Sequence, residues 1–149
     1  MKILIFRHGI AEDAAPDLPD PMRQLTRQGY NRTRLAAIGL TRLMRPVDVI
    51  LTSPYIRAEQ SAVILGQAMR RTPQTLHELA GDRDPQDAID AIFQREDTSI
   101  AIVGHNPQLE QIATLLCTPQ RRPRKKHAPL SHYHPGEKED AADPVSASP

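Results

Sequence analysis

Three short apolar runs along the chain predict buried strands. They cover residues 3–6, 47–51 and 100–103, and they consist mostly of β-branched and other aliphatic side chains with little alternation of polar positions. Runs of this kind are typical of strands that are covered on both faces in a parallel sheet. A shorter candidate strand covers residues 75–77. We therefore expect a mostly parallel central sheet.

The stretches between these runs have the periodicity of amphipathic helices. The pattern predicts a helix from Thr26, as N-cap, to about residue 44, and further helices over residues 54–69, 85–96 and 107–117. Strands that alternate with helices in this way predict an α/β fold. The residues that we expect on the buried helix faces are Ala36, Leu40, Leu43, Ala58, Ala62, Leu65, Ala88, Ile89, Ile92, Phe93, Leu109, Ile112, Ala113 and Leu116.

Composition changes abruptly after Thr118. Residues 119–149 contain six of the 14 prolines, six Lys or Arg, one aromatic side chain and almost no aliphatic ones. Such a segment cannot bury enough apolar surface to offset the entropy that ordering removes. We therefore predict one folded domain over residues 1–118 and a basic, proline-rich, disordered tail over residues 119–149.

Charge and cysteine content narrow the class of protein. The net charge is only +1, which does not favour a general nucleic-acid binder. The single cysteine, Cys117, excludes an internal disulfide and suits a reducing compartment. No apolar run approaches the roughly eighteen residues of a membrane span. We expect a soluble, cytoplasmic protein.

Candidate chemistry gathers at the ends of the predicted strands. His8 follows the first strand and His105 follows the third, while Arg57 lies in the first turns of the helix after the second. Ligands of open α/β sheets bind beyond the carboxyl ends of the strands, so these side chains and Arg7 should converge. Guanidinium groups match phosphate oxygens bidentately, and a neutral imidazole can attack phosphorus without a metal. The pattern predicts a phosphate pocket that contains two imidazoles.

The chain contains FRHG at 6–9, SPYIRAEQS at 53–61 and IVGHNP at 102–107. In this order, the three motifs resemble those of the histidine phosphatase superfamily, also called phosphoglycerate mutase-like. Two further stretches are similar in order and spacing to the small SixA type, the bacterial phosphohistidine phosphatases. The resemblance covers residues 1–117 and implies a three-layer α/β/α fold and a phosphatase with neither metal nor cofactor. The two further stretches are RQLTRQG at 23–29 and LHELAGDRDP at 76–85.

The resemblance implies a role for each matching residue. His8 would be the nucleophile that becomes phosphorylated, and His105 would complete the catalytic set. Arg7 and Arg57 would grip the phosphoryl group. Larger members protonate the leaving oxygen with an acidic residue, and Glu78 lies in the corresponding region as a candidate acid. The further substrate-binding candidates are Arg23, Gly9 and Asn106.

The chain departs from the family pattern at its C-terminal end. Family members usually continue past the last helix into a further strand, whereas here the tail at 119–149 takes that position. We therefore expect the C-terminal strand to be missing or replaced. A sheet edge left open in this way would invite pairing with a partner or lower the stability of the fold.

Three interpretations of function remain open. The leading one is removal of a phosphoryl group from phosphohistidine on a signalling protein, such as a histidine phosphotransfer domain, because little chain is left for a lid over a metabolite. The first alternative is a phosphatase of small phosphomonoesters with the same chemistry. The second is a catalytically weak phosphate-binding protein. The sequence does not indicate an oligomeric state.

Overall fold

The computed structural model describes residues 1–118. The predictions of a disordered tail and of a missing or replaced C-terminal strand lie outside the described residues. Four strands form one parallel sheet in the order β1-β4-β2-β3, which confirms the predicted parallel sheet. The strands are β1 (Lys2–Arg7), β2 (Val49–Thr52), β3 (Gln74–Thr75) and β4 (Ser99–Gly104).

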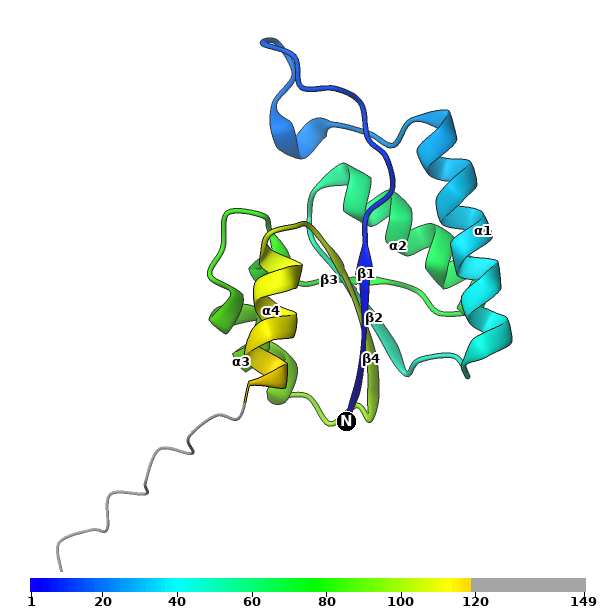
Figure 1. The fold of residues 1–149 in the computed structure, drawn as a ribbon, viewed down its shortest axis with the longest axis vertical. Helices are drawn as coiled ribbons and strands as arrows, with labels where there is room; N and C mark the ends of the chain where they lie inside the picture. Colours follow the sequence, from blue (N-terminus) through cyan, green and yellow to red (C-terminus); the bar gives the residue numbers. More distant parts are fainter. Residues whose placement is uncertain (119–149) are drawn as a thin grey trace, which may run out of the picture.

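Helices cover both faces of this sheet, which gives the three expected layers (Figure 1). α1 (Arg27–Leu43) and α2 (Ile56–Met69) pack together on one face, and α3 (Pro85–Phe93) and α4 (Gln108–Cys117) lie on the other. Two short 3₁₀ helices follow strands β1 and β3 in the chain. They are η1 (Asp20–Met22) and η2 (His77–Leu79).

The strands are buried on both sides because successive residues point to opposite faces of a sheet. Ile50 of β2 and Val103 of β4 belong to the core cluster that packs against α1 and α2. Their neighbours Leu51 and Ile102 belong to the cluster that packs against α3 and α4. Two cores therefore share one sheet, and this explains why the strand sequences are apolar without alternation.

Side-chain caps determine where two of the helices begin. Thr26 precedes α1 as predicted, and its hydroxyl oxygen accepts a hydrogen bond from the Gly29 N–H at 2.9 Å. Asp84 caps α3 in the same way, accepting from the Gln86 N–H at 2.8 Å. Each cap satisfies an amide that the first helical turn leaves without an intrahelical partner.

The predicted face of α1 is partly wrong. Leu43 is 85% exposed and Ala36 is also exposed, whereas the buried residues of the helix are Gly29, Thr33 and Ala37. These three small residues recur every four positions and form a narrow stripe that lets α1 approach its neighbours closely. Of the predicted face, Leu40 packs against the core as expected, and Ala36 and Leu43 do not.

The ends of other predicted elements are corrected as well. Phe93 is 57% exposed because it is the last residue of α3, which ends before the predicted residue 96. Pro54 precedes α2 instead of lying in its first turn. The strand predicted over 75–77 is shorter and ends at Thr75, since η2 begins at His77. Ala113 and Leu116 of α4 are only half-buried.

Candidate active site

The carboxyl ends of β1 and β4 bring two histidines together at one edge of the sheet. The strand register pairs Arg7 with Gly104, so His8 and His105 leave the sheet next to each other. The backbone N–H of His8 donates to the Gly104 carbonyl oxygen at 3.1 Å. The centroids of the two imidazole rings lie 5.0 Å apart. The parallel register therefore produces the convergence that the strand-end motifs predict.

The neutral His8 ring carries its lone pair on Nε2. Its Nδ1 lies 2.7 Å from the Gly9 carbonyl oxygen, which can only accept, so Nδ1 holds the proton. The Arg57 Nε–H donates to Nε2 at 3.3 Å. Burial lowers the pKa of His8, and the positive charges of three nearby arginines lower it further. The ring is thus neutral, with an unprotonated Nε2 beside a cation.

Arg57 is the buried cation of the site, with only 7% of its side chain exposed. Its Nη1 donates to the Asp20 backbone carbonyl at 2.7 Å, and its Nη2 donates to Asp20 Oδ2 at 3.0 Å. Arg23 donates from Nη1 to the other carboxylate oxygen, Oδ1, at 2.8 Å. Asp20 therefore bridges two arginines that were predicted to bind a phosphoryl group.

His105 is almost completely buried, at 4% exposed. Its Nε2 shares a 2.7 Å hydrogen bond with the Ser53 hydroxyl, and its ring centroid lies 4.7 Å from that of Tyr55. Burial lowers the pKa of His105 to about 3, and His8 and Arg57 contribute in the same direction. Its Nδ1 is buried and has no hydrogen-bond partner among residues 1–118.

The loop that follows His8 packs tightly against α1 and α2. The Gly9 N–H donates to the Ser61 hydroxyl at 3.0 Å. A Cβ atom at Gly9 would lie 2.3 Å from Thr33 Oγ1 and 3.0 Å from the Gly29 carbonyl oxygen. Only glycine fits such a close approach, so the helices fix the backbone that carries the His8 ring.

Positive charge surrounds the opening beside His8. A hollow of about 550 Å³ is lined by His8 together with Arg7, Arg23 and Arg32. Arg7 is exposed at the end of β1, and Arg32 is exposed on α1. Three arginines that line the same hollow as an imidazole favour an anionic ligand.

Two predicted site residues lie away from this centre. Asn106 is exposed, and its Nδ2 donates to Glu110 Oε1 at 2.7 Å. Glu78 lies in η2 and lines a separate hollow with Arg83. Within the described part of the chain, no hydrogen bond or ring contact joins either residue to His8. Their roles stay predictions.

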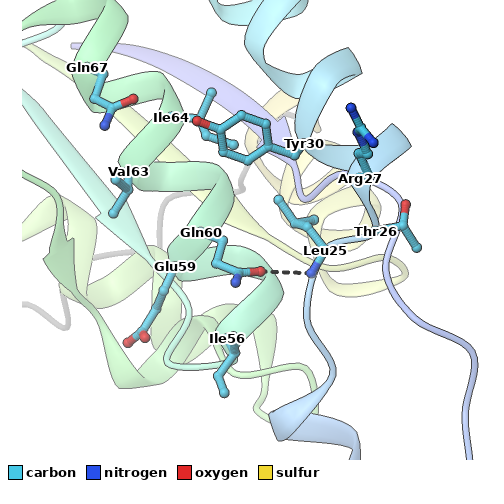
Figure 2. Close-up of a pocket in the computed structure, with 10 residues that line it drawn as sticks. All are labelled: Leu25, Thr26, Arg27, Tyr30, Ile56, Glu59, Gln60, Val63, Ile64 and Gln67. Carbon is cyan, nitrogen blue, oxygen red and sulfur yellow. Dashed lines mark hydrogen bonds between the residues drawn. The ribbon is translucent and has the colours of Figure 1, made fainter.

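A hydrogen bond holds the loop that carries Arg23 against α2 (Figure 2). The Leu25 N–H donates to Gln60 Oε1 at 2.7 Å, beside a groove between α1 and α2. Arg23 also donates from Nε to the Glu12 carbonyl oxygen at 2.7 Å. The bond to Glu12 links two parts of the loop, and the bond to Gln60 holds the loop against α2. The Arg23 side chain therefore has a defined position.

Four residues in contact with the site are not identified from the sequence. Ser53, Tyr55 and Ser61 lie within SPYIRAEQS, so the motif around Arg57 was a signal that could have found them. Asp20 has no comparable signal, because its contact with Arg57 joins residues 37 positions apart and lies in no recognised motif.

Comparisons with known proteins show the family. No family model matches the chain. An uncharacterised protein of Picosynechococcus sp. is 40% identical over 118 residues, covering 76% of this chain and 71% of the relative. The phosphohistidine phosphatase SixA of Escherichia coli is 30% identical over 129 residues, covering 83% of this chain and 78% of the relative. The chain belongs to the histidine phosphatase superfamily. Within that superfamily it is SixA-like.

Solved histidine phosphatases agree with this assignment. A structure of the protein histidine phosphatase SixA complexed with tungstate superimposes with a TM-score of 0.70 at 27% identity, covering 83% of this chain and 81% of that one. The phosphoglycerate mutase-like α/β fold that the motifs imply is therefore confirmed. In the described part of this histidine phosphatase, no helix is long and apolar enough to cross a membrane.

Proposed function

We propose that the chain is a phosphatase that removes the phosphoryl group from phosphohistidine on a protein, through a covalent intermediate on His8. The observation that carries the proposal is the orientation of the His8 ring. The Gly9 carbonyl holds the proton on Nδ1, and the lone pair of Nε2 faces Arg57. Two facts about relatives support it: the E. coli relative is a phosphohistidine phosphatase, and a SixA structure contains tungstate, a tetrahedral oxyanion.

In the first step the phosphoryl group moves from the substrate to His8. The Nε2 lone pair forms a bond to phosphorus while the bond from phosphorus to the substrate imidazole breaks. Arg57 and Arg23 neutralise the charge of the phosphoryl oxygens. In the tautomer that carries its proton on Nδ1, the neutral His105 ring donates a further hydrogen bond to them. The Gly9 carbonyl stabilises the positive charge that develops on the His8 ring, since it accepts from Nδ1–H.

In the second step water attacks phosphorus and the bond to His8 Nε2 breaks. The electron pair of that bond returns to Nε2, and the proton of the water passes to a phosphate oxygen or to solvent. Inorganic phosphate leaves, and His8 regains the tautomer that the Gly9 carbonyl selects. The two steps divide one slow hydrolysis into two faster displacements.

The acid–base character of the site favours a phosphoramidate over a phosphomonoester. A substrate imidazole whose other nitrogen is protonated leaves as a neutral ring, whereas an alkoxide needs a proton from the enzyme. Asp20 contacts Arg57 and is the nearest carboxyl group to consider as a donor. The hydrogen bond from Arg23 lowers the pKa of Asp20, and the hydrogen bond from Arg57 lowers it to a smaller extent. Asp20 is therefore ionised at neutral pH and cannot donate that proton. Glu78 lines a different hollow.

The charge around the opening fits an acidic protein surface as the carrier of the phosphohistidine. Arg32 of α1 lines the hollow beside His8, and α1 contains no Asp or Glu. Among residues 1–118 no ion pair involves Arg32. Charge complementarity of this kind speeds association and orients the partner more than it raises affinity. A histidine phosphotransfer domain with an acidic rim is the proposed partner class.

The test is phosphate release from a histidine-phosphorylated phosphotransfer domain. The parent chain should release phosphate, and His8→Ala should be slower by a factor of about 1,000 or more because the nucleophile is gone. His77→Ala is the matched control, since His77 is exposed in η2 and has no contact with His8. It should match the parent.

Other outcomes select between the remaining interpretations. Faster release from a panel of small phosphomonoesters than from the phosphoprotein would favour the first alternative. Tight binding of tungstate with no phosphate release from either class of substrate would favour a phosphate-binding protein. Release that persists in His8→Ala would contradict the proposed nucleophile.

A further inference from the structure

Asp20 occupies the donors that a phosphoryl group needs. Its two carboxylate oxygens accept separately from Arg57 Nη2 at 3.0 Å and from Arg23 Nη1 at 2.8 Å. Arg57 is a predicted phosphoryl ligand, and Arg23 is a predicted substrate-binding residue. A carboxylate and a phosphoryl group use the same planar fork of N–H donors, so the two anions cannot both be bound there in full.

The two sides of this contact differ in freedom. The Arg57 side chain is 7% exposed and is also held by the Asp20 backbone carbonyl at 2.7 Å, so it cannot leave the site. The Asp20 side chain is 55% exposed. A rotation about its side-chain bonds would carry the carboxylate into water without breaking the backbone contact to Arg57. The carboxylate is therefore the partner that moves.

Burial of Arg57 explains why an anion has to take the place of Asp20. A buried guanidinium without a counter-charge is strongly unfavourable, so the site always requires an anion beside it. In the free protein that anion is Asp20. A ligand displaces it only if the ligand pairs with both arginines better than a carboxylate does.

We propose that Asp20 is a built-in competitor for the phosphoryl site, and that it excludes weakly bound anions from Arg57 and Arg23. The proposal rests on the proposed function in one respect, namely that these arginines bind the phosphoryl group. It assigns Asp20 a role in selectivity, with tetrahedral oxyanions as the ligand class that displaces it. Asp20 is not the proton donor of the reaction.

Two isosteric probes test the proposal without any need for turnover. Tungstate is a tetrahedral dianion, and perrhenate is a tetrahedral monoanion of nearly the same size. Calorimetry would measure the Kd of each probe for the parent, Asp20→Asn, Asp20→Ala and Asp17→Asn. Asp17 is the matched control, because it is exposed in the same loop and makes no contact with either arginine. Thermal unfolding of each variant verifies its fold.

A displaced competitor predicts a particular pattern of affinities. Asp20→Asn should bind both probes more tightly by the same factor, about tenfold, because the free energy of displacing the carboxylate is a property of the protein and not of the probe. Asp20→Ala should show at least this gain. Inorganic phosphate should inhibit the variant more strongly by a similar factor, and Asp17→Asn should match the parent.

A carboxylate that stays in place predicts a different pattern. Its repulsion scales with the charge of the probe, so the gain for tungstate would be about the square of the gain for perrhenate. That result would overturn the proposal. Unchanged or weaker binding of tungstate by Asp20→Asn would also overturn it, and would make Asp20 a positioning residue for the two guanidinium groups.

The outcome is separable from the fate of the proposed function. A parent that hydrolyses phosphohistidine and binds tungstate, with no gain in either Asp20 variant, contradicts only the role of Asp20. A parent and variants that all fail to bind both probes contradict the phosphoryl site itself, and with it both proposals.

Discussion

At the scale of single residues, His105 links the stability of the fold to pH. In the folded chain its burial lowers its pKa from 6.5 to about 3. As the pH falls below 6.5 the unfolded chain binds a proton on this ring, whereas the folded chain does not until about pH 3. The contribution of this ring to stability is therefore complete above pH 6.5 and is lost as the pH falls.

We predict that this single ring lowers the free energy of unfolding by about 1.4 kcal/mol for each pH unit between about pH 6 and 4. His105→Asn does not titrate and keeps a polar group beside Ser53, so it should remove that part of the slope. Urea unfolding of both proteins over this range measures the difference. The lowered pKa of His8 leaves a residual slope of the same sign in the variant. Equal slopes in the two proteins would contradict the prediction.

Residues of the site differ in how far the sequence can identify them. His8 and His105 each closely follow an apolar run, and Arg57 lies at the start of the helix after another, where a parallel sheet places ligand-binding residues. The tautomer of His8 could not be predicted, because it depends on the direction of the Gly9 carbonyl. Asp20 could not be predicted either, since only the folded loop brings it to Arg57.

At the scale of elements, the approach of the loop after β1 to α1 depends on Gly29. A Cβ atom at this position would lie 2.0 Å from the Ile10 carbonyl oxygen, a backbone atom that already accepts from the Thr26 N–H at 2.9 Å. The helix and the loop would have to separate to admit a methyl group. Because Ile10 is two residues from His8, this separation would also move the His8 ring.

We predict that Gly29→Ala destabilises the fold by about 2 kcal/mol or more and weakens tungstate binding. Gly39→Ala in the same helix is the matched control, because nothing lies within 4 Å of a Cβ atom there. It should stabilise the fold by about 0.5–1 kcal/mol, as alanine usually does in place of a helical glycine. Urea unfolding measures both changes. Similar effects from the two substitutions would contradict the role of the close approach.

The elements also show where pattern analysis succeeds and where it fails. Strands were predicted well because both of their faces are buried, although β2 begins at Val49, after the polar Asp48 that the predicted run included. The buried face of α1 was predicted poorly, since it consists of Gly29, Thr33 and Ala37, which carry little hydrophobic signal. Tertiary packing selects such residues for their small size. A search for periodic large apolar residues therefore cannot identify this face.

At the scale of the whole molecule, the described residues 1–118 contain two core clusters, one on each face of the sheet. β1 pairs with β4 on one side, and no described strand pairs with its other side. The predicted domain boundary after residue 118 can therefore be tested by truncation there. The outcome depends on whether residues 119–149 contribute anything to the edge at β1.

We predict that residues 1–118 alone unfold in one cooperative transition with a Tm within about 5 °C of the full chain, which corresponds to less than about 1 kcal/mol. Calorimetric scans of the two proteins measure this. A much larger loss of stability would show that residues 119–149 belong to the fold, and would support a replaced strand over a missing one.

The pairing of the first strand with the last sets the order in which the site can form during synthesis. Lys2 of β1 pairs with Ser99 of β4, and the ring contact of His8 is with His105. A chain leaves the ribosome at about 5–20 residues per second, so His8 emerges seconds before its partners exist. His8 is thus the first catalytic candidate to be synthesised, and it reaches its position only after β4 and His105 have been made. A nascent chain arrested before β4 should therefore carry His8 and yet be unable to take up a phosphoryl group.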